Sequence, residues 1–134
     1  MSGVSVIRAL LVASSGLTDI VPATKIFAGV VPLKTAVPAI SVGQVSGTEN
    51  LTVKMATRPM RVERVQVTVE AASYKQQKEV LELVREACVR GSGNVNGVTL
   101  DSILPDGEGP DFMDHDTKVY FQSRDFIVKW FPAA

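Results

Sequence analysis

The chain has 134 residues, which is the length of one domain with one hydrophobic core, so we expect residues 1–134 to form a single unit. Hydrophobic residues make up 46% and charged residues 21%, and the longest apolar runs are far shorter than a membrane span of roughly 20 residues. A secretion signal pattern is also absent, so we expect a protein of the reducing cytoplasm, without a membrane.

Fourteen basic and fourteen acidic residues cancel, which argues against a protein that grips phosphates over its whole surface. The charges are nevertheless segregated along the chain. Residues 1–64 carry seven basic and three acidic side chains, a net charge of +4, and residues 65–134 carry seven and eleven, a net charge of −4. The sharpest acidic stretch is 105–117, which we expect to be a loop.

The first predicted element is a helix, because apolar residues recur at helical spacing at Val4, Ile7, Leu10 and Leu11. Ser14-Ser15-Gly16 should end this helix. We expect a further short turn of helix over 18–22 and a short strand over 25–29. A loop to Pro38 follows, and the alternation in 39–46 predicts the next strand, with one face formed by Ile40, Val42 and Gln44.

The segment 46–60 is rich in turn residues and becomes basic at its end. Connections this long are uncommon in compact domains unless they have a function, and exposed apolar residues in one would suggest a partner surface. We therefore predict a hairpin arm that either projects towards a partner or folds back onto its own domain. The candidate interaction residues of this arm are Glu49, Leu51, Val53, Lys54, Met55, Arg58 and Arg61.

Residues 61–90 carry the clearest pattern in the sequence, a strand that leads into a helix. Val65, Val67 and Val69 share one face of the strand. The helix should present an inner face formed by Tyr74, Gln77, Val80, Leu81, Val84, Ala87 and Cys88. Ser73 is the predicted N-cap and Arg90-Gly91 the predicted stop. Leu81 and Val84 should pack on the valine face, and Cys88 should be a buried, unreactive thiol.

The last third of the sequence predicts two further strands. Asn96-Gly97 is a turn signal, and the strand after it should point Val98, Leu100 or Ile103 inward. The aromatic-rich segment 118–131 is the longest strand signal. Because most strands follow one another without crossover helices, we expect an α+β fold: a mostly antiparallel sheet of about four to five strands with helices packed on one face.

Patterns for catalysis and for metal or cofactor binding are absent from the sequence. The acidic stretch does not match the calcium-loop spacing, because Asp111 stands six positions into it where a glycine is required. His115 is the only histidine, which leaves no multi-histidine zinc site, and no nucleophile motif or phosphate loop occurs. We therefore expect a protein that is not an enzyme and that has no metal and no cofactor.

Several segments follow one another in a fixed order: Ile26–Gly29, Pro38–Val42, Ser46–Thr48, Arg64–Val69 with Ala72–Tyr74, Gly109–Asp111 and Arg124–Val128. In order and spacing, over nearly the whole chain, they resemble the tail-completion, or tail-terminator, proteins of long-tailed bacteriophages. The resemblance implies an α+β protomer that forms a hexameric ring at the head-proximal end of the tail tube, terminates tube growth and joins the tail to the head connector. DNA would pass through the ring without specific binding.

The resemblance also implies the partners and the location. The partners would be further copies of the chain, the major tail tube protein and the head-side connector or stopper protein, in a virion neck assembled in the host cytoplasm. We hypothesise that the arm reaches a neighbouring copy or the tube protein, and that some acidic side chains face the channel and repel DNA phosphates: Asp106, Glu108, Asp111, Asp114 and Asp116. Two alternatives stay open, a head-side neck adaptor and a small-ligand-binding α+β domain.

Overall fold

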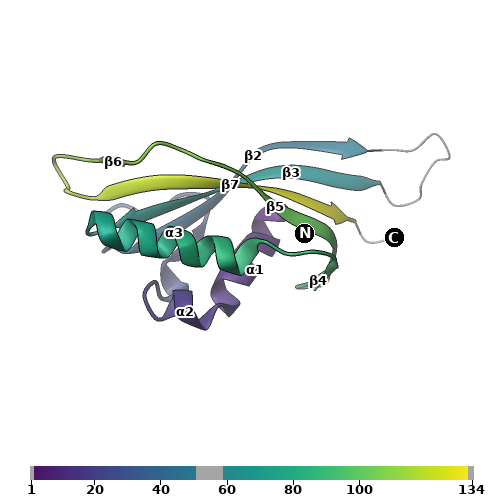
Figure 1. Ribbon diagram of the computed structural model, residues 1–134, viewed down its shortest axis with the longest axis horizontal. Helices are drawn as coiled ribbons and strands as arrows, with labels where there is room; N and C mark the ends of the chain where they lie inside the picture. The colour runs from purple at the N-terminus through teal and green to yellow at the C-terminus, as the bar shows by residue number, and fades with distance from the viewer. Residues whose placement is uncertain (1, 51–58, 133–134) are drawn as a thin grey trace.

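The computed structural model describes residues 2–50 and 59–132, which form a helical layer against one face of a long sheet (Figure 1). The α+β prediction, with helices on one face, is confirmed. The elements in chain order are α1 (Gly3–Ala13), α2 (Ser15–Thr18), the 3₁₀ turn η1 (Ala23–Lys25), β1 (Ile26–Ala28), β2 (Ala39–Asn50), β3 (Met60–Ala71), α3 (Tyr74–Cys88), β4 (Gly93–Val95), β5 (Val98–Glu108), β6 (Phe112–Met113) and β7 (Tyr120–Phe131).

The sheet has the strand order β1-β2-β3-β7-β5-β4, and β6 pairs with β7 beyond the end of β5. β1 and β2 are parallel, and the other pairs are antiparallel. The described residues thus contain seven strands instead of about four to five, because β4 and β6 have three and two residues, too few to show a periodicity in the sequence. β7, the last strand in the chain, lies between β3 and β5.

The helix-covered face of the sheet holds the core. The predicted valine face of β3 is confirmed, since Val65, Val67 and Val69 are all fully buried. Leu81, at 4% exposure, and Val84 reach this core from α3 as predicted. Cys88 is buried as well, and burial raises the pKa of its thiol to about 12, so the thiol stays protonated and unreactive at neutral pH.

The predicted start of α3 is confirmed and its predicted end is wrong. The Oγ atom of Ser73 accepts a hydrogen bond from the backbone N–H of Gln76 at 3.1 Å. The helix ends at Cys88, before the expected stop at Arg90-Gly91. Arg90 instead exchanges two backbone hydrogen bonds with Ile103 of β5, at 3.1 and 2.9 Å. A tertiary strand contact, which the local pattern does not contain, therefore ends the helix.

The segment after α1 agrees with the prediction in part. The predicted end of the first helix is confirmed, because α1 ends at Ala13 with Ser14 as its C-cap. Ser14 has a second role, since its Oγ atom caps α2 by accepting a hydrogen bond from the N–H of Leu17 at 3.4 Å. The helical turn expected over 18–22 is replaced by α2 before it and η1 after it. The turn signal Asn96-Gly97 is confirmed: both residues have positive φ angles, 51° and 80°, which suits the tight turn between β4 and β5.

Candidate functional site

The β2–β3 hairpin is the first candidate interaction surface, and it extends past the helical layer at one end of the molecule (Figure 1). The two strands stay paired from Ala39 and Glu70 to Asn50 and Met60, with an irregularity between Gln44 and Ser46. Residues 44–49 are exposed. The predicted arm 46–60 is therefore strand at both of its ends, and five of its candidate residues lie outside the described part of the chain: Leu51, Val53, Lys54, Met55 and Arg58.

Glu49 and Arg61 are the two candidate arm residues that the structure describes. They are directly opposite each other across the hairpin, so their side chains share one face. The Arg61 guanidinium lies against Gly47, where an added Cβ atom would approach it to 3.0 Å. Within the described residues Arg61 makes no ion pair, so its charge is available to a partner.

A buried carboxylate ties the base of this hairpin to the helical layer. Glu63 is 2% exposed, and its Oε1 atom accepts hydrogen bonds from the backbone N–H of Gly3 at 2.9 Å and from Nε1 of Trp130 at 2.7 Å. Gly3 is the first residue of α1, where free N–H groups and the helix dipole favour a negative charge. The sequence analysis missed this contact, although Glu63 has the same parity as Val65 and so belongs to the core face.

The five acidic candidates are not brought together, and two of them lie on opposite faces of the sheet. Asp106 is 3.2 Å from the Nε atom of Arg64 on the helix-free face. The Oε1 atom of Glu108 is 2.9 Å from the Nη2 atom of Arg124. Arg124 lies opposite the core-facing residue Val67 on the neighbouring strand, so this ion pair is on the helix-covered face. The expected acidic loop 105–117 is also partly strand, because β7 pairs with β5 as far as Glu108 and with β6.

Asp111 holds the irregular segment between β5 and β6 against the start of α3. Its Oδ2 atom accepts hydrogen bonds from Nζ of Lys78 at 2.9 Å and from the hydroxyl of Tyr74 at 2.8 Å. The Lys78 hydrogen bond first, and the Tyr74 hydrogen bond second, lower the pKa of Asp111. Gln122 completes the contact, because it accepts a hydrogen bond from Lys78 and donates one to the carbonyl oxygen of Gly109.

The remaining acidic candidates lie in the turn before β7. Asp114 uses its Oδ1 atom to accept hydrogen bonds from the backbone N–H groups of Asp116 and Thr117, at 2.9 and 3.4 Å. Neither Asp114 nor Asp116 forms an ion pair within the described residues. His115, between them, is exposed.

The helix-free face carries a polar network that the sequence analysis missed. Asp125 is 6% exposed and accepts hydrogen bonds from Nε of Arg64 at 2.7 Å and from the Gln66 amide at 3.2 Å. The hydrogen bond to Asp125, and then its charge, raise the pKa of Arg64. The hydroxyls of Thr68 and Ser123 lie 3.0 Å apart in the next pair along the strands. Alternation predicted that this face of β3 is polar, but it could not predict which strand supplies the partners.

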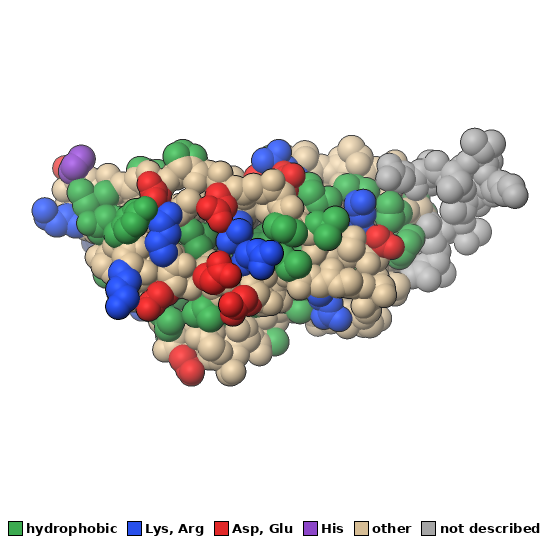
Figure 2. All heavy atoms as spheres, viewed as in Figure 1, with side chains coloured by type: hydrophobic (Ala, Val, Ile, Leu, Met, Phe, Trp, Pro, Cys, Tyr) green, Lys and Arg blue, Asp and Glu red, His purple; other side chains and the backbone are tan. Residues whose placement is uncertain are grey.

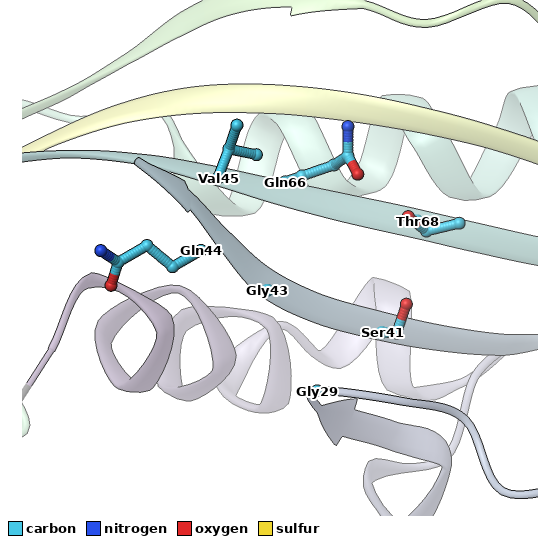
Figure 3. Close-up of a pocket in the computed structure, with 7 residues that line it drawn as sticks. All are labelled: Gly29, Ser41, Gly43, Gln44, Val45, Gln66 and Thr68. Atoms are coloured by element: carbon cyan, nitrogen blue, oxygen red, sulfur yellow. The ribbon is translucent and has the colours of Figure 1, made fainter. Parts of the chain in front are cut away.

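Two hollows open on the helix-free side of the molecule. A polar hollow of about 180 Å³ lies beside the point where β1 ends, and Figure 3 shows Ser41, Gln66 and Thr68 around it. A larger pocket of about 280 Å³ is lined by the β1–β2 loop from Val31 to Val37 and by residues at the end of β3 and the start of β7. The same loop carries the most exposed large hydrophobic side chain described, Leu33, at 96% exposure.

The described residues contain no group of three or more His, Cys, Asp or Glu side chains that could hold a metal ion. No helix in that part of the chain is long and apolar enough to cross a membrane. On the face in Figure 2, acidic and basic side chains are interspersed and do not form a single-sign field. The notable surfaces are therefore the arm, the turn before β7 and the two hollows, all of which suit contacts with other molecules.

Comparison with known proteins identifies the family. The family model "Tail completion protein gp17" matches residues 5–128. Among solved structures, a chain from "Virion of native gene transfer agent (GTA) particle" is similar with a TM-score of 0.78 and 15% identity, covering 98% of this chain and 96% of that one, which shows a shared fold. No curated protein matches the chain. The chain therefore belongs to the tail completion protein gp17 family and is a structural, non-enzymatic component of the virion tail.

Proposed function

We propose that this chain forms a hexameric ring at the head-proximal end of the tail tube, where it terminates tube growth and joins the tail to the head connector. Its partners are further copies of itself, the major tail tube protein and the head-side connector or stopper protein. Family membership supports this proposal, and so does the shape of the protomer. The observation that carries it is that the two ends of the long sheet are unlike.

The two ends differ in what they offer to another molecule. One end carries the paired strands of the β2–β3 hairpin, which reach past the helices with exposed side chains from Gln44 to Glu49 (Figure 1). The other end carries the apolar pocket and the exposed Leu33. A ring of identical subunits needs contacts between two different patches, because each subunit must use one patch on each side. Unlike ends supply such patches.

The arm residues are proposed to make the subunit or tube contacts. Glu49 and Arg61 share a face near the end of the described hairpin, and Arg61 lacks a described ionic partner. Lys54 and Arg58 add two positive charges in the same part of the sequence. Their replacement by glutamate is expected to prevent ring assembly or tail joining, and normal joining in such a variant would contradict the assignment.

The proposal that acidic side chains face the channel rests mainly on the turn before β7. Arg64, Arg124 and Lys78 compensate three of the five acidic candidates, whereas Asp114 and Asp116 keep uncompensated charge in the described part of the chain. Uncompensated carboxylates along a channel would repel DNA phosphates and keep passing DNA from sticking. A ring structure with both residues on its outer wall would exclude this role.

The decisive experiment compares virions with tails made in the absence of this chain. We expect tubes of uncontrolled length that do not join heads, and a six-fold ring at the head-proximal end of normal tails in class averages from electron microscopy. The alternative, a head-side adaptor, is tested by looking for this chain on heads purified from a host that makes heads but no tails. If the chain is bound to tail-less heads and absent from head-less tails, the adaptor is correct and the terminator proposal is wrong.

A further inference from the structure

The pocket at the end of the sheet opposite to the arm has the features of a binding site for an extended segment. It has a volume of about 280 Å³ and is lined by the Val31–Val37 loop, Val119 and Phe121. Leu33, in the lining loop, is 96% exposed, and Val30, just before the loop, is 83% exposed. Large apolar side chains that gather at a hollow surface commonly mark a contact with another protein.

The same pocket also contains a carboxylate without a partner. Glu70, near the end of β3, lines the pocket, and burial raises the pKa of its carboxyl group. Asp114 lines the pocket as well, so with an arm docked there Asp116 would be the one of these two turn carboxylates left to face a channel. Lys34 lies on the pocket wall without an ion pair to Glu70 or Asp114. A half-buried carboxylate that no described cation contacts is costly, and a basic side chain from outside would compensate it.

The sequence of the arm tip complements this pocket. Residues 51–58 read Leu-Thr-Val-Lys-Met-Ala-Thr-Arg, so that apolar side chains alternate with polar ones and two positive charges are included. Three apolar side chains would cover the apolar wall, and Lys54 or Arg58 would meet Glu70. We propose that the arm tip of one copy docks into the pocket formed by the β1–β2 loop and the start of β7 on the neighbouring copy. This inference rests on the proposed ring.

The arm tip cannot reach the pocket of its own chain. Along β3, ten residues separate Glu70 at the pocket from Met60 at the arm, a distance of about 33 Å at 3.3 Å per residue. Asn50 and Met60 are paired, and nine residues connect them. A loop of that length that leaves and returns to the same place reaches at most about 18 Å. An arm tip that docks in this pocket must therefore come from another copy of the chain.

A neighbouring copy is the occupant that fits both the charge and the symmetry. A contact from the arm of one copy to the pocket of the next joins two different patches, which is the kind of contact that closes a ring. Docking would remove the exposed Leu33 side chain from water by placing it against apolar side chains of the neighbouring arm tip. Each copy would then both donate an arm and accept one.

Cysteine cross-linking in assembled tails tests the contact directly. Copies with Met55→Cys are combined with copies with Leu33→Cys, and the buried native Cys88 stays silent in both. We expect a disulfide-linked dimer only when the two variants are mixed. Gly91→Cys, at an exposed site in the loop before β4, replaces Leu33→Cys in the matched control and should give only background dimer.

Charge reversal provides the second test. Glu70→Lys should reduce the number of joined particles about tenfold, whereas Glu86→Lys, which makes the same change at an exposed site on α3, should have no effect. Adding Lys54→Glu or Arg58→Glu to Glu70→Lys should restore joining. Far-ultraviolet circular dichroism of each variant shows that the fold is kept. Equal losses for the Glu70 and Glu86 variants would contradict the pocket contact.

The outcomes separate this inference from the ring proposal. If tails show a six-fold ring but Met55→Cys cross-links to the tube protein and not to Leu33→Cys, the inference is overturned and the ring stands. If the Met55–Leu33 dimer forms in tails whose class averages have no six-fold ring, the contact stands and the ring proposal is wrong. If neither the dimer nor a ring is found, both are wrong.

Discussion

The two faces of the sheet are built from alternate residues of the same strands, and they are stabilised in different ways. On the helix-covered face, Val65, Val67 and Val69 are fully buried under α1 and α3. On the helix-free face, Arg64, Gln66 and Asp125 form charged and hydrogen-bonded pairs across β3 and β7. The first face depends on apolar area removed from water, and the second depends on which polar groups the strand pairing places together.

This difference indicates which face tolerates substitutions and which face can bind another molecule. A polar group without a partner is costly in the core, where among the described residues the amide of Gln77 is the main exception, so the helix-covered face must stay closed for the domain to fold. The helix-free face is partly exposed and contributes less stability per residue, because solvent screens its charges. The open hollows described here lie on that second face or at its ends, where a partner can bind without disturbing the core.

The largest effect is expected from a charge placed in the helix-covered core. Leu81→Asp buries a carboxylate with no partner at a site that is 4% exposed, and it should cost more than about 4 kcal/mol. Since domains of this size have about 5–15 kcal/mol in total, the variant should be largely unfolded in a denaturant titration. Glu82→Gln, at the exposed neighbouring position, is the control and should change stability by less than about 0.5 kcal/mol. A Leu81→Asp protein that melts with the parent would place α3 elsewhere.

The second effect concerns a buried polar contact on the helix-covered face, the one made by Glu63. Glu63→Ala leaves the N–H of Gly3 and Nε1 of Trp130 without their acceptor, which should cost about 2–4 kcal/mol. Trp130 is the only tryptophan, so its fluorescence in a urea titration reports on this site. Glu49→Ala, an exposed change on the same strand pair, should have almost no effect on stability. Equal midpoints for the two variants would show that the buried contact is unimportant.

A smaller effect is expected on the helix-free face. Asp125→Asn weakens the ion pair with Arg64 but leaves Asp106 as a second partner for that arginine. The free energy of unfolding should therefore fall by only about 1 kcal/mol. A double-mutant cycle with Arg64→Ala should give a coupling free energy smaller than the Glu63 effect, and this coupling should shrink in 1 M salt, where the Debye length is only about 3 Å. If the coupling free energy exceeded the loss caused by Glu63→Ala, the helix-free face would contribute more to stability than the helix-covered face, contrary to our expectation.

The smallest effect is a pH dependence at Asp111. Its pKa in the folded state is lowered by Lys78 and Tyr74, below the ordinary value of about 3.9. The contact therefore stabilises the fold above that value and is lost as the pH falls through the lower, folded-state pKa. The melting temperature of the parent should exceed that of Asp111→Asn at pH 6, and the difference should shrink as the pH falls below the ordinary carboxyl pKa of about 3.9 and through the lower, folded-state pKa. A difference that persists in acid would mean that the contact does not depend on the charge of Asp111.

Much of the local structure could be predicted from the sequence, because it repeats with the period of its own element. The burial of Leu81 and Val84 follows from helical spacing, and the Ser73 cap follows from the residue that precedes the helix. The candidate site could be predicted only in outline. The arm was recognised as a segment, but the pocket at the other end joins the β1–β2 loop to the start of β7, which are more than eighty residues apart in the chain.

The sequence by itself determined the α+β class, the core stripe of the central strand and helix, and the family to which the chain belongs. Only the tertiary structure decided that β7 lies between β3 and β5, and hence that Asp125 meets Arg64 and that Glu63 meets Trp130. The reason is physical. A side chain's face follows from its neighbours in sequence, but its partner across the sheet depends on strand order and register, which are set by the packing of the whole domain.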